Sequence, residues 1–122
     1  VDGVEVFVTK YDILKEYSQG AYIIDIEDNE RLIKIEFEVK NTTNRDVIVK
    51  TDSNIQYILS SKQKYYPLVT AIENDIIFFE KNIKANQSKK AVILFKIAKS
   101  EKLEELRLEV INNEQKKSVL FK

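Results

Sequence analysis

The chain has 122 residues, 43% of them hydrophobic and 33% charged, which favours a globular core and excludes a disordered or collagen-like chain. Basic and acidic residues each number 20, so the net charge is zero and no nucleic-acid partner is expected. Cysteine and histidine are absent, which excludes disulfides, thiolate zinc sites and the commonest general base. We expect one domain, residues 1–122, with no cofactor.

Taken in chain order, alternation of apolar and polar residues predicts a series of short strands. The clearest is LIKIEFEVK at 32–40, where odd positions are apolar and even positions from 34 are charged, as in a half-buried antiparallel strand. Polar clusters separate the runs, which is typical of an all-β sandwich. The predicted strands are 4–8, 22–26, 32–40, 47–49, 55–59, 76–79, 91–97, 106–110 and 119–121.

Eight or nine strands exceed the usual number for one flat sheet, so two packed sheets are expected. The predicted core residues are Val6, Val8, Ile24, Ile33, Ile35, Phe37, Val39, Ile93, Phe95, Leu106 and Leu108.

Two segments are helical candidates. SEKLEEL, residues 100–106, has Ser100 as an N-cap and Glu101 and Glu104 near the positive end, and is long enough for a turn or two. YDILKEY, residues 11–17, is ambiguous between helix and strand.

The segment NTTNRD, residues 41–46, is interpreted as a hairpin turn, because Asn and Asp side chains bond their own backbone and tolerate positive φ. Asn41 and Asn86 also match the N-glycosylation pattern. The abundance of Ile, Lys and Asn suggests an AT-rich bacterial genome, in which such matches are accidental.

The acidic segment DIEDNE, residues 25–30, offers candidate calcium ligands in Asp25, Glu27 and Asp28. An EF-hand loop also needs a glycine at its sixth position and a glutamate at its twelfth, and both are missing here. A solvated turn is therefore the favoured interpretation, and no metal is expected.

Aromatic residues supply the second set of candidate ligand contacts. Tyr57, Tyr65 and Tyr66 could form a platform for a sugar or a peptide, although tyrosine is also an ordinary occupant of strand edges and cores. For catalysis, only Ser60, Ser61 and Lys62 stand together, in a turn-like stretch. We therefore expect no enzyme and assign no catalytic residue.

Residues 82–110, NIKANQSKKAVILFKIAKSEKLEELRLEV, resemble the end of bacterial telokin-like, immunoglobulin-like domains of Gram-positive secreted proteins and lipoproteins, a superfamily that includes an immunoprotective extracellular antigen. IKIEFEVKNTTNRDVIV is similar to the early strand and hairpin of that family, although the usual Pro-Gly loop is replaced by KANQSKK. The resemblance implies a β-sandwich outside the cytoplasmic membrane, attached through a lipid on a cysteine upstream of the domain, with no catalytic residues.

These observations predict an all-β fold: an immunoglobulin-like antiparallel β-sandwich of two packed sheets with at most one short helical turn. The first residue is Val1, so we expect a processed or trimmed chain, and any signal peptide or anchor would lie upstream of it. The expected function is non-enzymatic binding of a protein or cell-envelope component at the cell surface. The alternative is a module that binds a small ligand, either a carbohydrate or calcium.

Overall fold

The computed structural model describes residues 3–14, 17–19, 22–24, 26–50, 55–68, 76, 80–112 and 115–120. The elements in chain order are β1 (Val4–Leu14), β2 (Tyr17–Gln19), β3 (Tyr22–Ile24), β4 (Glu30–Asn41), β5 (Val47–Lys50), β6 (Ile55–Ser60), β7 (Lys64–Tyr65), β8 (Glu80–Ile83), β9 (Ser88–Ala98), the 3-10 helix η2 (Leu103–Glu105), β10 (Arg107–Asn112) and β11 (Gln115–Leu120).

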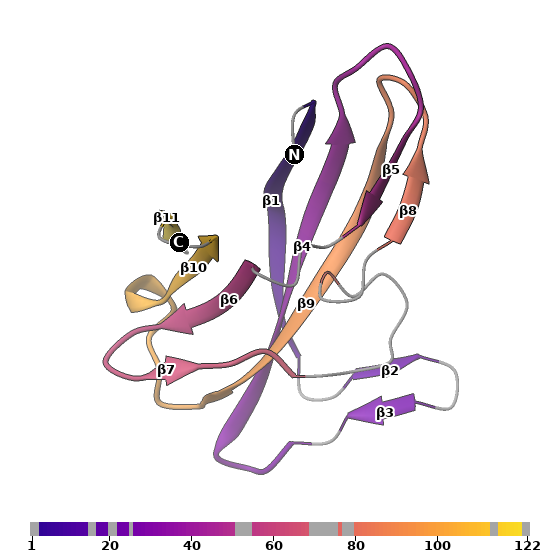
Figure 1. Ribbon diagram of the computed structural model, residues 1–122. Helices are drawn as coiled ribbons and strands as arrows, with labels where there is room; N and C mark the ends of the chain where they lie inside the picture. The colour runs from indigo at the N-terminus through magenta and orange to yellow at the C-terminus, as the bar shows by residue number, and fades with distance from the viewer. Residues whose placement is uncertain are drawn as a thin grey trace.

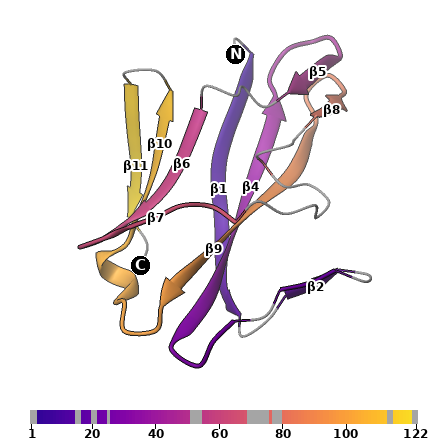
Figure 2. The same ribbon diagram turned by 60° about the horizontal axis from the view of Figure 1, so that its bottom comes forward.

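The fold is an immunoglobulin-like antiparallel β-sandwich. The first sheet has the order β1-β4-β9 and the second has the order β11-β10-β6-β7. Two shorter ladders, β2-β3 and β5-β8, extend the arrangement, and all pairs among the described strands are antiparallel. Figures 1 and 2 show the second sheet on one side of the first, with the β2-β3 hairpin on the opposite side. The predicted fold class is therefore confirmed.

The alternation in LIKIEFEVK becomes the central strand β4, which pairs with β1 on one side and β9 on the other. Its odd-numbered residues from Ile33 to Val39 are buried between the sheets, where apolar side chains leave water. Most of the predicted core is confirmed: Ile33, Ile35, Phe37, Val39, Ile93, Phe95, Leu106 and Leu108 are all buried.

One predicted core residue is wrong and two need qualification. Val6 lies opposite Val39, yet half of it (50%) is exposed, because β1 forms the edge of its sheet and the second sheet does not cover this position. Val8 is half-buried and packs against the core. The side chain of Ile24 lies outside the described residues.

A β-bulge at Thr9 divides β1 into two halves whose side-chain alternation is out of phase. Val8 pairs with Phe37 and Lys10 pairs with Glu36, so Thr9 is an extra residue in the ladder. The apolar positions change from even to odd numbers across this bulge, which breaks the simple alternation. Residues 11–14 of the ambiguous segment YDILKEY are thus strand, not helix.

A second, smaller apolar cluster lies on the outer face of the β1-β4-β9 sheet. Leu32 and Leu94 are fully buried there, with Leu14, Ile26, Leu68 and Val92 packed against them. The Leu68 N–H donates to the Leu94 carbonyl oxygen at 2.9 Å, so the segment after β7 runs beside β9. This end of the sheet is therefore covered on both faces.

The helical turn expected in SEKLEEL is the 3-10 helix η2, but Ser100 does not cap it. The N-cap position is Lys102, which makes no capping side-chain hydrogen bond. Glu104 and Glu105 occupy the first turn. No helix in the described ranges is long and apolar enough to cross a membrane.

Candidate functional site

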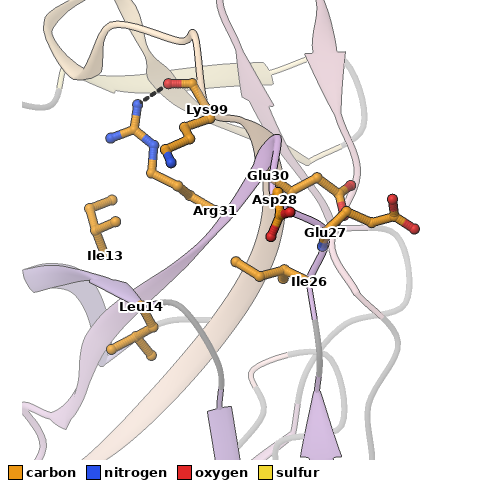
Figure 3. A pocket seen from close by; sticks show the side chains of 8 residues that line it. All are labelled: Ile13, Leu14, Ile26, Glu27, Asp28, Glu30, Arg31 and Lys99. Atoms are coloured by element: carbon orange, nitrogen blue, oxygen red, sulfur yellow. Dashed lines mark hydrogen bonds between the residues drawn. The ribbon is translucent and has the colours of Figure 1, made fainter.

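A pocket of about 420 Å³ lies at the end of the first sheet where β1 finishes and β4 begins. Its lining residues are Ile13, Leu14, Ile26, Glu27, Asp28, Glu30, Arg31 and Lys99. Figure 3 shows the acidic side chains together on one side, with Ile13 and Leu14 on the other and Arg31 beside Lys99. The pocket thus combines apolar surface with separated charges of both signs.

Arg31 is held in place by backbone carbonyl groups. Its guanidinium donates to the carbonyl oxygen of Lys99, drawn in Figure 3, and to that of Glu101 at 3.0 Å. These bonds tie the start of β4 to the turn after β9, and the Lys99 N–H completes the link by donating to the Asn29 carbonyl oxygen at 2.8 Å. Arg31 therefore acts first as a structural anchor of the pocket wall.

The acidic segment forms a tight turn. Glu30 donates its backbone N–H to the Glu27 carbonyl oxygen at 3.0 Å, and its carboxylate accepts the Glu27 N–H at 3.1 Å. Glu27 and Asp28, two of the candidate calcium ligands, are exposed at the pocket rim. The third, Asp25, lies outside the described residues. Within the part of the chain that the structure describes, no group of three or more acidic residues could hold a metal ion.

The three candidate tyrosines lie in different environments. Tyr57 is buried in the core, where its ring meets Phe37 edge-to-face with centroids 6.0 Å apart. Burial raises its pKa to about 12, because the phenolate would lose its hydration. Tyr66 is 67% exposed. Tyr57 is therefore not available to a surface platform.

Tyr65 connects β7 to the turn after β9. Its hydroxyl donates to Glu101 Oε1 at 2.9 Å and accepts the Ala98 N–H at 3.3 Å and the Gln63 side-chain amide. Partial burial raises the pKa of Tyr65, and the hydrogen bond to Glu101 acts in the same direction. Its hydroxyl is occupied by these three neighbours.

The serine and lysine residues considered for catalysis do not converge. The Ser60 hydroxyl donates to Glu109 Oε1 at 3.1 Å across the β6-β10 pair. The Ser61 hydroxyl is buried and has no hydrogen-bond partner among the described residues, while Lys62 is exposed.

The NTTNRD segment is a turn organised by the buried Asn41. Its side-chain amide donates to the carbonyl oxygens of Arg45 at 2.8 Å and Ile83 at 2.9 Å. Its side-chain oxygen accepts from the N–H and the hydroxyl of Thr43. Asn86, in the other glycosylation pattern, has φ of 60° in the exposed turn between β8 and β9. Both asparagines thus have clear structural roles.

The free edge of β1 is a surface that the sequence analysis did not identify. β1 has 11 residues and is the first strand of its sheet, so none of the described strands pairs with its other edge. Val6 (50%) and Phe7 (43%) are exposed there. Val6 was expected in the core because its alternation is regular, and only the sheet order shows that it lies at an open edge.

Comparisons with known proteins identify the fold alone. No protein-family model and no curated protein matches this chain. The chain is similar to an uncharacterized β-sandwich protein from Clostridium difficile 630, with 13% identity, a TM-score of 0.63, and coverage of 100% of this chain and 87% of that one. It is also similar to a conserved hypothetical protein from Bacillus anthracis, with 18% identity, a TM-score of 0.58, and coverage of 98% and 89%. The resemblance to telokin-like lipoprotein domains is not confirmed by these matches.

Proposed function

We propose that this chain is a non-enzymatic binding domain at the cell surface, held there by an upstream lipid anchor, and that it binds through the free edge of β1. The observation that carries the proposal is an 11-residue edge strand in which the consecutive residues Val6 and Phe7 are both exposed. An edge strand offers backbone N–H and C=O groups to an incoming strand, and exposed apolar side chains add contact area.

The local sequence of β1 favours this use of the edge. Edge strands are commonly protected by charged residues, yet residues 4–8 read VEVFV and carry one charge. Beyond the bulge at Thr9, Lys10 and Asp12 restore the charged pattern. The open part of the edge is therefore the N-terminal half of β1.

The binding function is tested with the full chain as bait against envelope extracts of the source cells. We expect a partner that is retained by the wild type, lost with Val6→Lys, and kept with the matched control Ile48→Lys, since Ile48 is exposed on β5, which pairs with β8 in a separate ladder. Circular dichroism of each variant verifies folding. Equal retention by wild type and Val6→Lys would argue against the edge.

The proposed compartment has its own test. The native protein is isolated from membrane and soluble fractions, and its N-terminus and intact mass are determined. A diacylated cysteine upstream of the domain would support the surface location, which we propose from the resemblance to lipoprotein domains. An unprocessed cytosolic form would contradict it.

A second candidate function is binding of a small ligand, a carbohydrate, at the pocket between β1 and β4. The pocket has apolar surface from Ile13 and Leu14 and an exposed acidic rim with Glu27 and Asp28. Titration calorimetry with a glycan panel, repeated on Asp28→Asn, tests this function. Absence of heat with the wild type would remove it.

A further inference from the structure

We infer that the β1 edge takes up a second copy of this chain, in an antiparallel pair centred on Phe7. The inference rests on the proposed role of this edge in binding and specifies the partner. Three features of β1 support this pairing: the faces on which its side chains lie, the bulge at Thr9, and the charges on either side of the exposed Val6 and Phe7.

The pairing with β4 fixes the face of each β1 residue. Val6 and Val8 lie opposite the buried Val39 and Phe37, so they are on the inner face of the sheet. Phe7 lies opposite Glu38 on the outer face. The exposed pair Val6 and Phe7 therefore presents apolar surface on both faces of the same edge.

Two-fold symmetry restricts how two such edges can pair. An axis perpendicular to the sheet relates two antiparallel strands without exchanging the faces of the sheet, so directly opposed residues must share a face. An axis at Phe7 satisfies this condition. It places Phe7 opposite Phe7 of the second copy, and Val6 opposite Val8 of the second copy, so that apolar side chains meet on both faces.

The bulge at Thr9 brings the flanking charges into register. Because Thr9 is an extra residue, Lys10 lies on the outer face together with Glu5. In the pair centred on Phe7, Glu5 of each copy then lies beside Lys10 of the other, which gives two opposite-charge contacts by symmetry. Both residues are exposed.

Lys10 can make this contact without leaving an unpaired carboxylate behind. Lys10 Nζ lies 3.8 Å from Glu36 Oε2, and Lys90 Nζ lies closer to the same carboxylate, 3.4 Å from Oε1. Glu36 thus keeps an ion pair when Lys10 turns toward the second copy.

A neighbouring register fits less well. An axis at Val6 would place the charged Glu5 opposite the aromatic ring of Phe7 on the outer face, and it would leave Lys10 beyond the paired segment. The register centred on Phe7 matches apolar with apolar and acid with base. It would join the β1-β4-β9 sheets of the two copies into one continuous six-stranded sheet, with the two β1 strands at its centre.

A cysteine at the axis tests the register directly, because residues 1–122 contain no cysteine. Directly opposed residues of antiparallel strands have Cα atoms about 4.5–5.5 Å apart, which suits a disulfide. We expect Phe7→Cys in the 122-residue chain to form a covalent dimer on mild oxidation, and Glu5→Cys and Ile48→Cys to form much less. Equal crosslinking of all three would overturn the register.

A charge exchange tests the same pair without a covalent bond. Sedimentation velocity gives the dimer dissociation constant of the wild type, Glu5→Lys, Lys10→Glu and the double variant. Because each contact occurs twice, we expect each single change to weaken dimerisation roughly tenfold, about 1.4 kcal/mol, and the double variant to recover most of the loss. Within one copy, Glu5→Lys places a like charge opposite Lys40, and Lys10→Glu places one opposite Glu36. The double variant keeps both of these unfavourable pairs, so recovery of its dimerisation can come only from contact between copies.

The outcomes separate this inference from the proposed function. A wild-type chain that remains monomeric at high concentration overturns self-pairing, as does a dimer that is insensitive to Phe7→Lys. If an envelope partner is still captured by the wild type and lost with Val6→Lys, the edge binds a different protein and the proposed function survives.

Discussion

The side-chain amide of Asn41 donates a hydrogen bond to the carbonyl oxygen of Ile83 at 2.9 Å, which joins the end of β4 to the end of β8. Both residues are fully buried. The same amide reaches the Arg45 carbonyl oxygen within the turn, so one side chain fixes the turn and attaches it to the neighbouring ladder. A buried polar group that is fully satisfied in this way stabilises one arrangement over its alternatives.

Replacement of Asn41 should therefore destabilise the fold. Asn41→Ala leaves the buried Ile83 carbonyl without its donor, and we expect the free energy of unfolding to fall by about 2–3 kcal/mol. Asn41→Asp should cost at least as much at neutral pH, since a carboxylate cannot donate to either carbonyl oxygen. Urea denaturation followed by circular dichroism measures both.

The matched control for this prediction is Asn44→Ala in the same turn, where the side chain is exposed. Its effect should stay within about 0.5 kcal/mol. Similar losses for positions 41 and 44 would contradict the role assigned to Asn41.

The sequence was sufficient to predict the turn at residues 41–46 and the inner face of β4, because both depend on local residue types and on period-two alternation. It was not sufficient for β1. The exposure of Val6 depends on which strand lies at the edge of the sheet, and the strand character of residues 11–14 depends on the bulge at Thr9. Both follow from pairing between distant segments, which a local pattern does not contain.

The candidate site was likewise predictable from the sequence only in part. Glu27 and Asp28 were correctly expected in a turn, but their position beside Arg31 and Lys99 depends on the hydrogen bonds that tie β4 to the end of β9. Leu94 gives a further example. Its place in AVILFKI marks it as apolar, but its burial on the outer face depends on Leu68 and Ile26 lying over it.

Truncation of that outer-face cluster should be costly. We expect Leu94→Ala to lower the free energy of unfolding by about 2–4 kcal/mol, because it removes a fully buried side chain from a small apolar cluster. Ile48→Ala, at a position 70% exposed, should change it by less than about 0.5 kcal/mol. Guanidinium denaturation measures both changes. A small effect of Leu94→Ala would mean that Leu68 and Ile26 do not pack closely against Leu94.

The buried phenol of Tyr57 should make stability sensitive to alkaline pH. Its pKa in the folded state is about 12, above the ordinary value of 10.0, so the folded chain keeps a proton that the unfolded chain loses. This contribution is complete below pH 10 and disappears as the pH rises toward 12, with a loss of up to about 2–3 kcal/mol.

Tyr57→Phe isolates that effect from the titration of the lysines. We expect the variant and the wild type to differ little in free energy of unfolding at pH 7, and the variant to lose less stability between pH 10 and 12. Parallel pH profiles of the two proteins would show that the phenol does not titrate differently on unfolding.

The hydroxyl of Tyr65 should stabilise the turn after β9. Tyr65→Phe removes the hydrogen bonds to Glu101 and Ala98, and we expect a loss of about 1–2 kcal/mol together with faster amide exchange at Ala98. Hydrogen exchange followed by NMR measures the second effect. In Glu101→Gln an acceptor remains, so a smaller loss is expected there, and unchanged exchange in Tyr65→Phe would contradict the link.

The close approach of Gly3 to Thr43 gives the last test, of how the N-terminal end of β1 meets the turn at residues 41–46. Gly3 has φ of +81°, and a Cβ atom there would lie 2.3 Å from Thr43 Cγ2. Its carbonyl oxygen accepts both the N–H and the hydroxyl of Thr42, so the backbone cannot move away freely.

We expect Gly3→Ala to lower the free energy of unfolding by about 2–3 kcal/mol, from positive-φ strain together with the clash. Thr43→Ser removes Cγ2 but keeps the hydroxyl that donates to Asn41, so the double variant should recover the part due to the clash and retain about 1 kcal/mol of strain. A double-mutant cycle by thermal denaturation measures the coupling. If the effects of Gly3→Ala and Thr43→Ser are additive, the turn shifts to accommodate the new methyl group. The N-terminal end of β1 is then less firmly held than its contacts indicate.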